Sequence, residues 1–153
     1  MLPLCIIALG FGTSVIGAAE LGGEFLTALV ADRIGLKHCA IGAVALSVIS
    51  YFLLPLLEGS LFSALTALFI IFFLFEFSIV TSLSLSTELV PAARATMMAA
   101  FYSASGLGRA LGAMVGARIW LGSGLYGTVS VSALASILAL LSLVAGLKHW
   151  QRV

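Results

Sequence analysis

Seven consecutive apolar residues, Ala67-Leu68-Phe69-Ile70-Ile71-Phe72-Phe73, decide the fold class of this chain. Apolar side chains occupy every face of this stretch, whereas a membrane-spanning β-strand alternates apolar and polar residues over about 10 positions. The stretch belongs to a longer apolar segment at 61–84, which reaches the length of about 20 residues that a spanning helix needs. Helices and closed barrels alone satisfy their backbone hydrogen bonds in lipid, so the sequence predicts a spanning helix here.

The composition of the whole chain indicates a membrane environment. Of its 153 residues, 62% are hydrophobic and 8% are charged, whereas soluble domains average about 45–50% and about 25%. A mean hydropathy of +1.26 also excludes a disordered chain, which has too little apolar surface to offset its ordering entropy. The net charge of +1 supplies no basic field, so DNA or RNA binding is excluded as a function class.

Charges and turn residues divide the chain into five apolar segments, each long enough to span a bilayer. Their approximate ranges are 4–31, 39–57, 61–84, 95–121 and 126–147. We therefore expect an all-α transmembrane bundle of about five helices that forms one membrane domain over residues 1–153. The first segment has no preceding Lys or Arg and is too long for a signal peptide, so we expect it to be structural.

Three residues predict how the linkers are built. Ser60 is suited to cap the third helix, and Pro91, which lacks an N–H, suits the first turn of the fourth. Pro55 lies in the last turn of the second segment, where we expect it to kink or end the helix.

The cations predict the orientation in the membrane. Five of them lie in linkers or the tail, all on one predicted side: Arg33, Lys37, Arg94, Lys148 and Arg152. The opposite linkers, at 58–60 and 122–124, hold no cation. The positive-inside rule then predicts an N-terminus outside and a C-terminus in the cytoplasm. We expect the protein to lie in the plasma (inner) membrane.

Four ionisable residues fall within the predicted spans: Glu20, Glu24, Glu76 and Arg109. Each costs at least about 2.5–3.5 kcal/mol to insert, so it must face protein or water. They lie on the first, third and fourth segments, whereas the second and fifth carry no charge within the membrane. We therefore expect the charged helices to line an interior cavity or interface, and the other two to face lipid as outer supports.

The chemistry of the acids has two interpretations. Glu20 and Glu24 are spaced i, i+4 and share a helix face, so repulsion and burial favour protonation of one of them, a candidate proton carrier. Alternatively, either acid is neutralised by Arg109 in an interhelical ion pair. Glu76 stands alone on a Phe-rich segment, which favours a functional role in a polar path.

Other residues have structural interpretations. Gly108, Gly112 and Gly116 are spaced by four residues and predict a close helix contact. Arg118, near the end of its segment, is expected to extend to the membrane interface. Cys5 and Cys39 are interpreted as packed thiols.

The sequence holds no recognisable catalytic or metal-binding pattern. His38 and His149 have no metal-ligand spacing, and neither HExxH nor GxSxG occurs. We therefore expect no enzyme activity, no metal and no cofactor.

Two cytoplasmic segments carry a family resemblance. The loop A-L-V-A-D-R-I-G-L-K at 28–37 resembles the signature G-x-x-x-D-R-x-G-R-K/R of the major facilitator superfamily through Asp32, Arg33, Gly35 and Lys37. Ala28 and Leu36 depart from that pattern, as is usual in its weaker second copy between the eighth and ninth helices. The segment at 88–94 resembles the family linker E-x-x-P-x-x-R through Glu88, Pro91 and Arg94, and 106–112 is similar to the eleventh helix of sugar-efflux and drug-efflux members.

The resemblance implies that the chain corresponds to helices eight to twelve of a twelve-helix transporter. It implies alternating-access export of a small molecule, coupled to protons, with the N-terminal half supplied elsewhere or by a partner chain. Asp32 would hold a helix N-terminus of the other half, and Arg33 would pair with Glu88. Together these residues would form a cytoplasmic gate: Asp32, Arg33, Gly35, Lys37, Glu88 and Arg94. Glu20, Glu24, Glu76 and Arg109 would line the transport path.

A second hypothesis comes from a different class of protein. The chain would then be a small integral-membrane accessory or assembly protein without transport activity, its polar helix faces buried against a larger complex.

Overall fold

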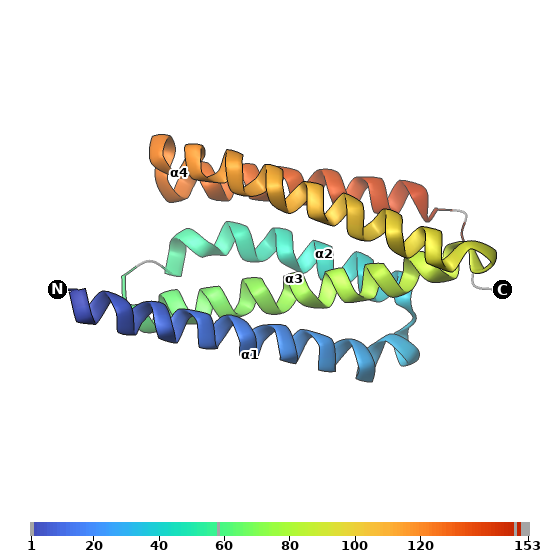
Figure 1. The fold of residues 1–153 in the computed structure, drawn as a ribbon, viewed down its shortest axis with the longest axis horizontal. Coiled ribbons are helices and arrows are strands. Elements are labelled where there is room, and N and C mark those ends of the chain that lie inside the picture. The colour runs from blue at the N-terminus through green and yellow to red at the C-terminus, as the bar shows by residue number, and fades with distance from the viewer. Residues whose placement is uncertain (1, 58, 149, 151–153) are drawn as a thin grey trace.

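The computed structural model describes residues 2–57, 59–148 and 150, with side chains described from residue 9 onward. The predictions for Glu58, His149, Arg152 and the Cys5 side chain lie outside this set. The described residues form helices joined by short turns and contain no strand (Figure 1). In chain order the elements are α1 (Leu2–Ile34), α2 (Leu36–Leu53), η1 (Leu54–Leu57), α3 (Leu61–Leu89), η2 (Pro91–Ala93) and α4 (Arg94–Gly146).

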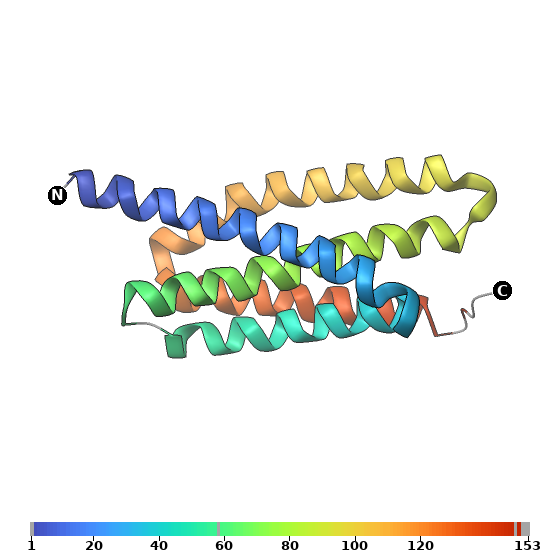
Figure 2. The same cartoon turned by 90° about the horizontal axis from the view of Figure 1, so that it is seen from below.

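The all-α membrane fold is confirmed, because four helices are long and apolar enough to cross a bilayer. The fourth is not one span. Its 53 residues would extend about 80 Å at 1.5 Å per residue, far more than a hydrocarbon core of about 30 Å. At Gly124 the backbone leaves the helix (φ 60°, ψ −149°), and the chain reverses its direction there (Figures 1 and 2). We call residues 94–123 the first arm and 125–146 the second arm.

Glycine makes this tight reversal possible. The positive φ of Gly124 is strained for any residue with a Cβ. One turn later, a Cβ on Gly127 would collide with the Cβ of Ser123. The apolar segments predicted at 95–121 and 126–147 thus correspond to the two arms.

The predicted linkers have the expected local chemistry. Ser60 caps α3, since its hydroxyl accepts a hydrogen bond from the N–H of Ser63 at 3.1 Å and forms a capping box. Pro55 lies in the 3-10 turn η1 that ends α2, and Pro91 begins the 3-10 turn η2 that leads into α4. The predictions for Ser60 and Pro55 are confirmed, whereas Pro91 occupies the start of a 3-10 turn that precedes α4 and not the first turn of α4 itself.

The boundary between the first two helices is tighter than predicted. The helix α1 continues past 31 to Ile34, and α2 begins at Leu36 rather than at 39, so a single residue separates them. Gly35 fills this position with φ 92°. Its N–H bonds to the Ala31 carbonyl and its carbonyl accepts from Cys39. The predicted segment ends before the charged residues Asp32 and Arg33, but a helix can continue beyond its apolar region into polar residues.

The closest helix contact lies between α1 and α3. Small residues recur every fourth position along the buried face of α1: Ala19, Gly23, Thr27 and Ala31. A Cβ on Gly23 would lie 2.9 Å from the backbone oxygen of Phe73 and 2.9 Å from the backbone nitrogen of Phe77. Small residues in this register allow two backbones to approach closely, which maximises packing where no hydrophobic effect drives association.

The helix α2 packs on the other side of α3 and against the end of α4. Cys39 and Ala43 contact Phe77, while Ala40 contacts Leu85 and Leu147. Its opposite face is exposed, with side chains such as Leu46, Ile49 and Phe52. The helix α2, which was predicted to face lipid as an outer support, is therefore also part of the core. In contrast, no residue of the first arm, all of which is described, is buried.

We predict that Gly23→Ala destabilises the bundle, because the new methyl group meets rigid backbone rather than a flexible side chain. The free energy of unfolding in detergent should fall by about 1–3 kcal/mol, the usual cost of overpacking. Gly17→Ala on the same helix is the matched control, since a Cβ there has nothing within 4 Å. Equal stability of the two variants would contradict the close backbone contact.

Candidate functional site

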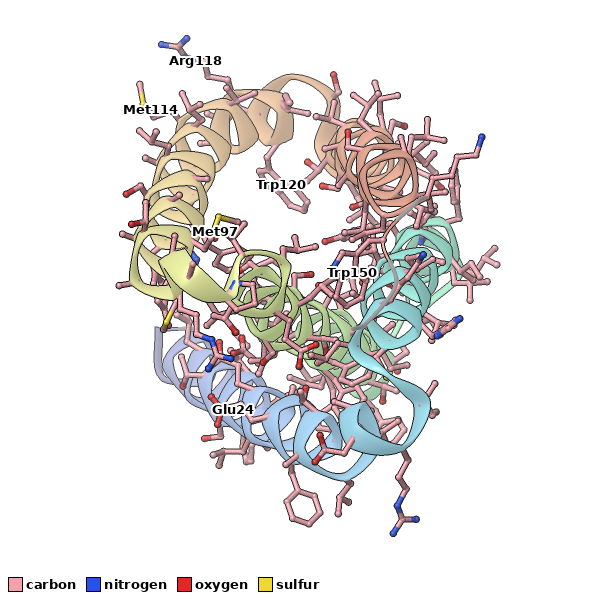
Figure 3. The ribbon with its side chains drawn as sticks, turned by 90° about the vertical axis from the view of Figure 1, so that its right-hand side faces the viewer. Glu24, Met97, Met114, Arg118, Trp120 and Trp150 are labelled. Atoms are coloured by element: carbon pink, nitrogen blue, oxygen red, sulfur yellow. The ribbon has the colours of Figure 1, made fainter. Side chains whose placement is uncertain are left out.

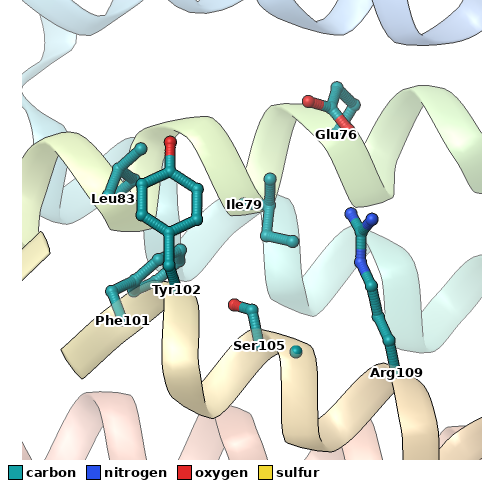
Figure 4. Close-up of a pocket in the computed structure, with 8 residues that line it drawn as sticks. Glu76, Ile79, Leu83, Phe101, Tyr102, Ser105 and Arg109 are labelled. Atoms are coloured by element: carbon teal, nitrogen blue, oxygen red, sulfur yellow. The ribbon is translucent and has the colours of Figure 1, made fainter. Parts of the chain in front are cut away.

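A groove runs between α3, the first arm of α4 and the C-terminal part of α1. It contains two cavities that share Leu83 and therefore adjoin along α3. The midspan cavity has a volume of about 280 Å³. Its lining consists of Glu76, Ile79, Leu83, Phe101, Tyr102, Ser105, Gly106 and Arg109 (Figure 4). The loop-end cavity, of about 420 Å³, lies nearer the connection between α1 and α2 and includes Asp32, Thr87 and Glu88.

Helical periodicity explains why these residues face one another. On α3, Glu76, Ile79 and Leu83 follow the i, i+3, i+7 spacing of one helix face. On the first arm, Tyr102 and Arg109 are related by the same seven-residue step. Two matching faces thus form the walls of the midspan cavity.

Opposite charges stand on the two walls. The Arg109 side chain extends from α4 toward Glu76 on α3 (Figure 4). The described residues show no direct ion pair between them, and Arg109 acts on the Glu76 carboxyl electrostatically across the cavity. The cavity therefore presents an acceptor and a charged donor to any molecule between them.

Two acids on α1 also interact electrostatically with Glu76. Glu20 and Glu24 are exposed, and both act electrostatically on Glu76. Figure 3 shows Glu24 on the side of α1 that faces α4. All four ionisable residues predicted for the transport path thus lie within electrostatic reach of one point on α3. The described residues show no direct pair of either acid with Arg109.

The predicted gate residues gather at one end of the bundle. Asp32 and Glu88 line the loop-end cavity together, although they belong to α1 and α3. The side chains of Arg33 and Arg94 are exposed. The pairing of Arg33 with Glu88 stays a prediction.

Lys37 has a partner that sequence reasoning missed. Its ammonium donates to the backbone carbonyls of Leu147 and Trp150, the latter at 3.2 Å. Leu147 is the C-cap residue of α4, and Trp150 lies in the segment after it. A cation at the C-terminal end of a helix interacts favourably with the partial negative charge there, so Lys37 stabilises the end of α4. The partners lie 110 residues apart. The one available signal was that both belong to the same predicted side of the membrane.

The glycines of the first arm remain uncovered. A Cβ on Gly108, Gly112 or Gly116 would meet nothing within 4 Å. Within the described chain no helix packs on them, so the close contact predicted there would have to come from another molecule or segment. In this structure the small residues of α1 make the close contact instead. Their four-residue spacing was visible in the sequence beside the two acids.

Metal chemistry finds no geometric support in the described part of the chain, where no three His, Cys, Asp or Glu side chains are grouped to hold an ion. His38 is exposed. Cys39 is a buried free thiol, in agreement with its interpretation as a packed residue.

Comparison with protein-family models, with curated proteins and with solved structures finds no match for this chain.

We predict that Lys37→Met loosens the end of α4, because two carbonyls lose a charged donor. Amide hydrogen exchange at residues 143–147 should accelerate, corresponding to a loss on the order of 1 kcal/mol. Lys148→Met removes the same charge from an exposed position at the same end and serves as the control. Similar exchange in both variants would mean that charge alone, not the bonds of Lys37, holds this end.

Proposed function

We propose that this chain is the C-terminal part of a secondary transporter of the major facilitator type, which exports a small molecule by alternating access and is coupled to protons. One observation carries the proposal: Glu76 of α3 and Arg109 of α4 line an open cavity within the predicted spans, and the two acids of α1 act electrostatically on Glu76. Ionisable groups within membrane spans are costly, and where they cluster around a cavity they favour a substrate or ion path.

The depth of the cavity agrees with this role. Arg109 lies 15 residues after Arg94, or about 22 Å along the helix axis. Glu76 lies 12 residues before Glu88, or about 18 Å. With Arg94 and Glu88 at the membrane surface, both distances would put the cavity well inside the bilayer, and secondary transporters bind their substrates near its middle.

The imbalance of charge supports coupling to protons. Three carboxyl groups, those of Glu20, Glu24 and Glu76, belong to this charged group, because Glu76 interacts electrostatically with both acids of α1 and with Arg109, which supplies its one guanidinium group. Because the guanidinium is always charged, it compensates one carboxylate at a time. A change in its distance from each acid would therefore drive proton uptake or release.

The proposed gate lies at the end of the same groove. Asp32 and Glu88 line the loop-end cavity, while Lys37 anchors the adjoining loop to the end of α4. Because Lys37 fixes the position of the connection between α1 and α2, Asp32 and Arg33 beside it would be held where charge contacts with the N-terminal half of the transporter could form and break. The uncovered glycine face of the first arm is the surface on which we propose that half to pack.

Proton coupling is tested by transport in proteoliposomes containing the product of the complete gene, with a panel of small molecules and an imposed pH gradient. We expect accumulation that disappears when the gradient is collapsed. Glu20→Gln or Glu24→Gln should change the pH dependence of the rate, whereas Arg118→Gln, at the exposed outer end of the first arm, should not. If both acid variants keep the original pH dependence, neither acid carries the proton.

The same assay tests the gate. We expect Asp32→Asn and Arg33→Ala each to slow transport about ten-fold or more, because a lost charge contact of about 1.4 kcal/mol changes an equilibrium ten-fold. Insertion and yield should remain normal, since both side chains are exposed. Lys148→Gln is the control at the same end. Unaltered flux in the two gate variants would remove Asp32 and Arg33 from the mechanism.

Absence of flux for every compound, together with purification of the protein in a stable complex with another membrane protein, would instead support the accessory function. The uncovered first arm is the feature that favours that second candidate.

A further inference from the structure

We propose that the midspan cavity binds a small zwitterion with an apolar side chain, as a neutral α-amino acid has. This inference rests on the transport function proposed above and names its substrate class. It follows from how charge, hydroxyl groups and apolar surface are distributed over the cavity walls.

The α4 wall suits an anionic group. Arg109 and Ser105 lie one helical turn apart on the same face and both line the cavity (Figure 4). A guanidinium offers several donors in a planar arrangement that matches a carboxylate, and the serine hydroxyl adds another donor. Gly106 lies between them without a side chain, which leaves room for the ligand to approach this wall.

The α3 wall suits a cationic group. Glu76 faces Arg109 across the cavity and accepts hydrogen bonds when ionised. Glu20 and Glu24 add negative potential at the same place from α1. An ammonium group beside Glu76 would therefore be attracted by three carboxyl groups, while the guanidinium group remains on the far wall.

The rest of the lining is apolar and aromatic. Ile79 and Leu83 extend from α3, and Phe101 and Tyr102 from the first arm, with the two rings edge to face at 6.3 Å between centroids. This surface can bury an aliphatic or aromatic side chain. The volume of about 280 Å³ falls just below the range of about 300–1,000 Å³ typical of drug-sized ligands, which favours a metabolite of amino-acid size.

Ligands with other charges leave a wall group uncompensated. A cation would be attracted by the acids but would leave the guanidinium group of Arg109 without an anionic partner on its wall, and an anion would leave Glu76 without a cationic partner. A neutral molecule would displace water from both charged groups without replacing its electrostatic contribution. Because an unpaired charge is costly to desolvate, a ligand that carries both charges fits these walls best.

Four probes of similar shape separate these possibilities: L-leucine, its amide (a cation), its N-acetyl derivative (an anion) and N-acetyl-leucinamide (neutral). Binding is measured by calorimetry on the product of the complete gene in lipid nanodiscs. We expect leucine to bind at least about ten-fold more tightly than each of the other three.

Two variants assign the walls. Arg109→Gln should reduce leucine binding about ten-fold and abolish the preference for leucine over leucinamide, since the carboxylate loses its partner. Glu76→Gln should abolish the preference for leucine over N-acetyl-leucine. Arg118→Gln, which removes a cation from the outer side of the first arm, should leave all four affinities unchanged (Figure 3). Preferences that survive in both wall variants would overturn the assignment.

The inference is also overturned if leucinamide or N-acetyl-leucine binds as tightly as leucine. The same holds if leucine, valine and phenylalanine all fail to bind at up to about 10 mM. Because this experiment measures binding and not flux, a negative result for the zwitterion site can be distinguished from a negative result for the transport function. Leucine that binds but is never transported would contradict the transporter, whereas transport of another class without leucine binding would contradict the zwitterion site.

Discussion

The backbone contact between α1 and α3 determines the arrangement of the charged groups. A Cβ on Gly23 would lie 3.0 Å from the Cβ of Glu76 itself, so the two helices touch at the position of that acid. Glu20 and Glu24 are on the turns beside Gly23 and therefore reach Glu76 electrostatically. Arg109 completes the group from a helix that is itself poorly packed. The site thus depends on one close helix crossing and on one exposed side chain from α4.

Composition and segment length predict the helical membrane fold because lipid permits few alternatives. The same constraint identifies Glu20, Glu24, Glu76 and Arg109, since each stands out against an apolar background. Helix caps and turns can also be predicted from the local sequence, as Ser60 and Pro55 show. These features depend on short stretches of sequence or on the solvent, and not on which helices are neighbours.

Features that depend on tertiary neighbours could not be predicted. The glycines of the first arm and the small residues of α1 have the same spacing, yet only α1 uses it within the described chain. The spacing indicates that a close contact is possible but not where a partner stands. Likewise, the sequence alone does not distinguish Lys37 from the other interfacial cations, because its partners at the end of α4 are distant in the sequence. The uncharged α2 was expected to face lipid alone, but its small residues also pack on α3.

The bonds from Lys37 to the end of α4 have a consequence for biogenesis. Lys37 is synthesised and inserted long before Leu147 and Trp150, which lie at least 110 residues later. Contacts of such large sequence separation form late, because the intervening chain must first be ordered. Until the ribosome has made the second arm of α4, the ammonium group of Lys37 lacks these two carbonyl partners. The docking of that arm therefore fixes the connection between α1 and α2, and a nascent chain arrested earlier would present this connection without its bonds to α4.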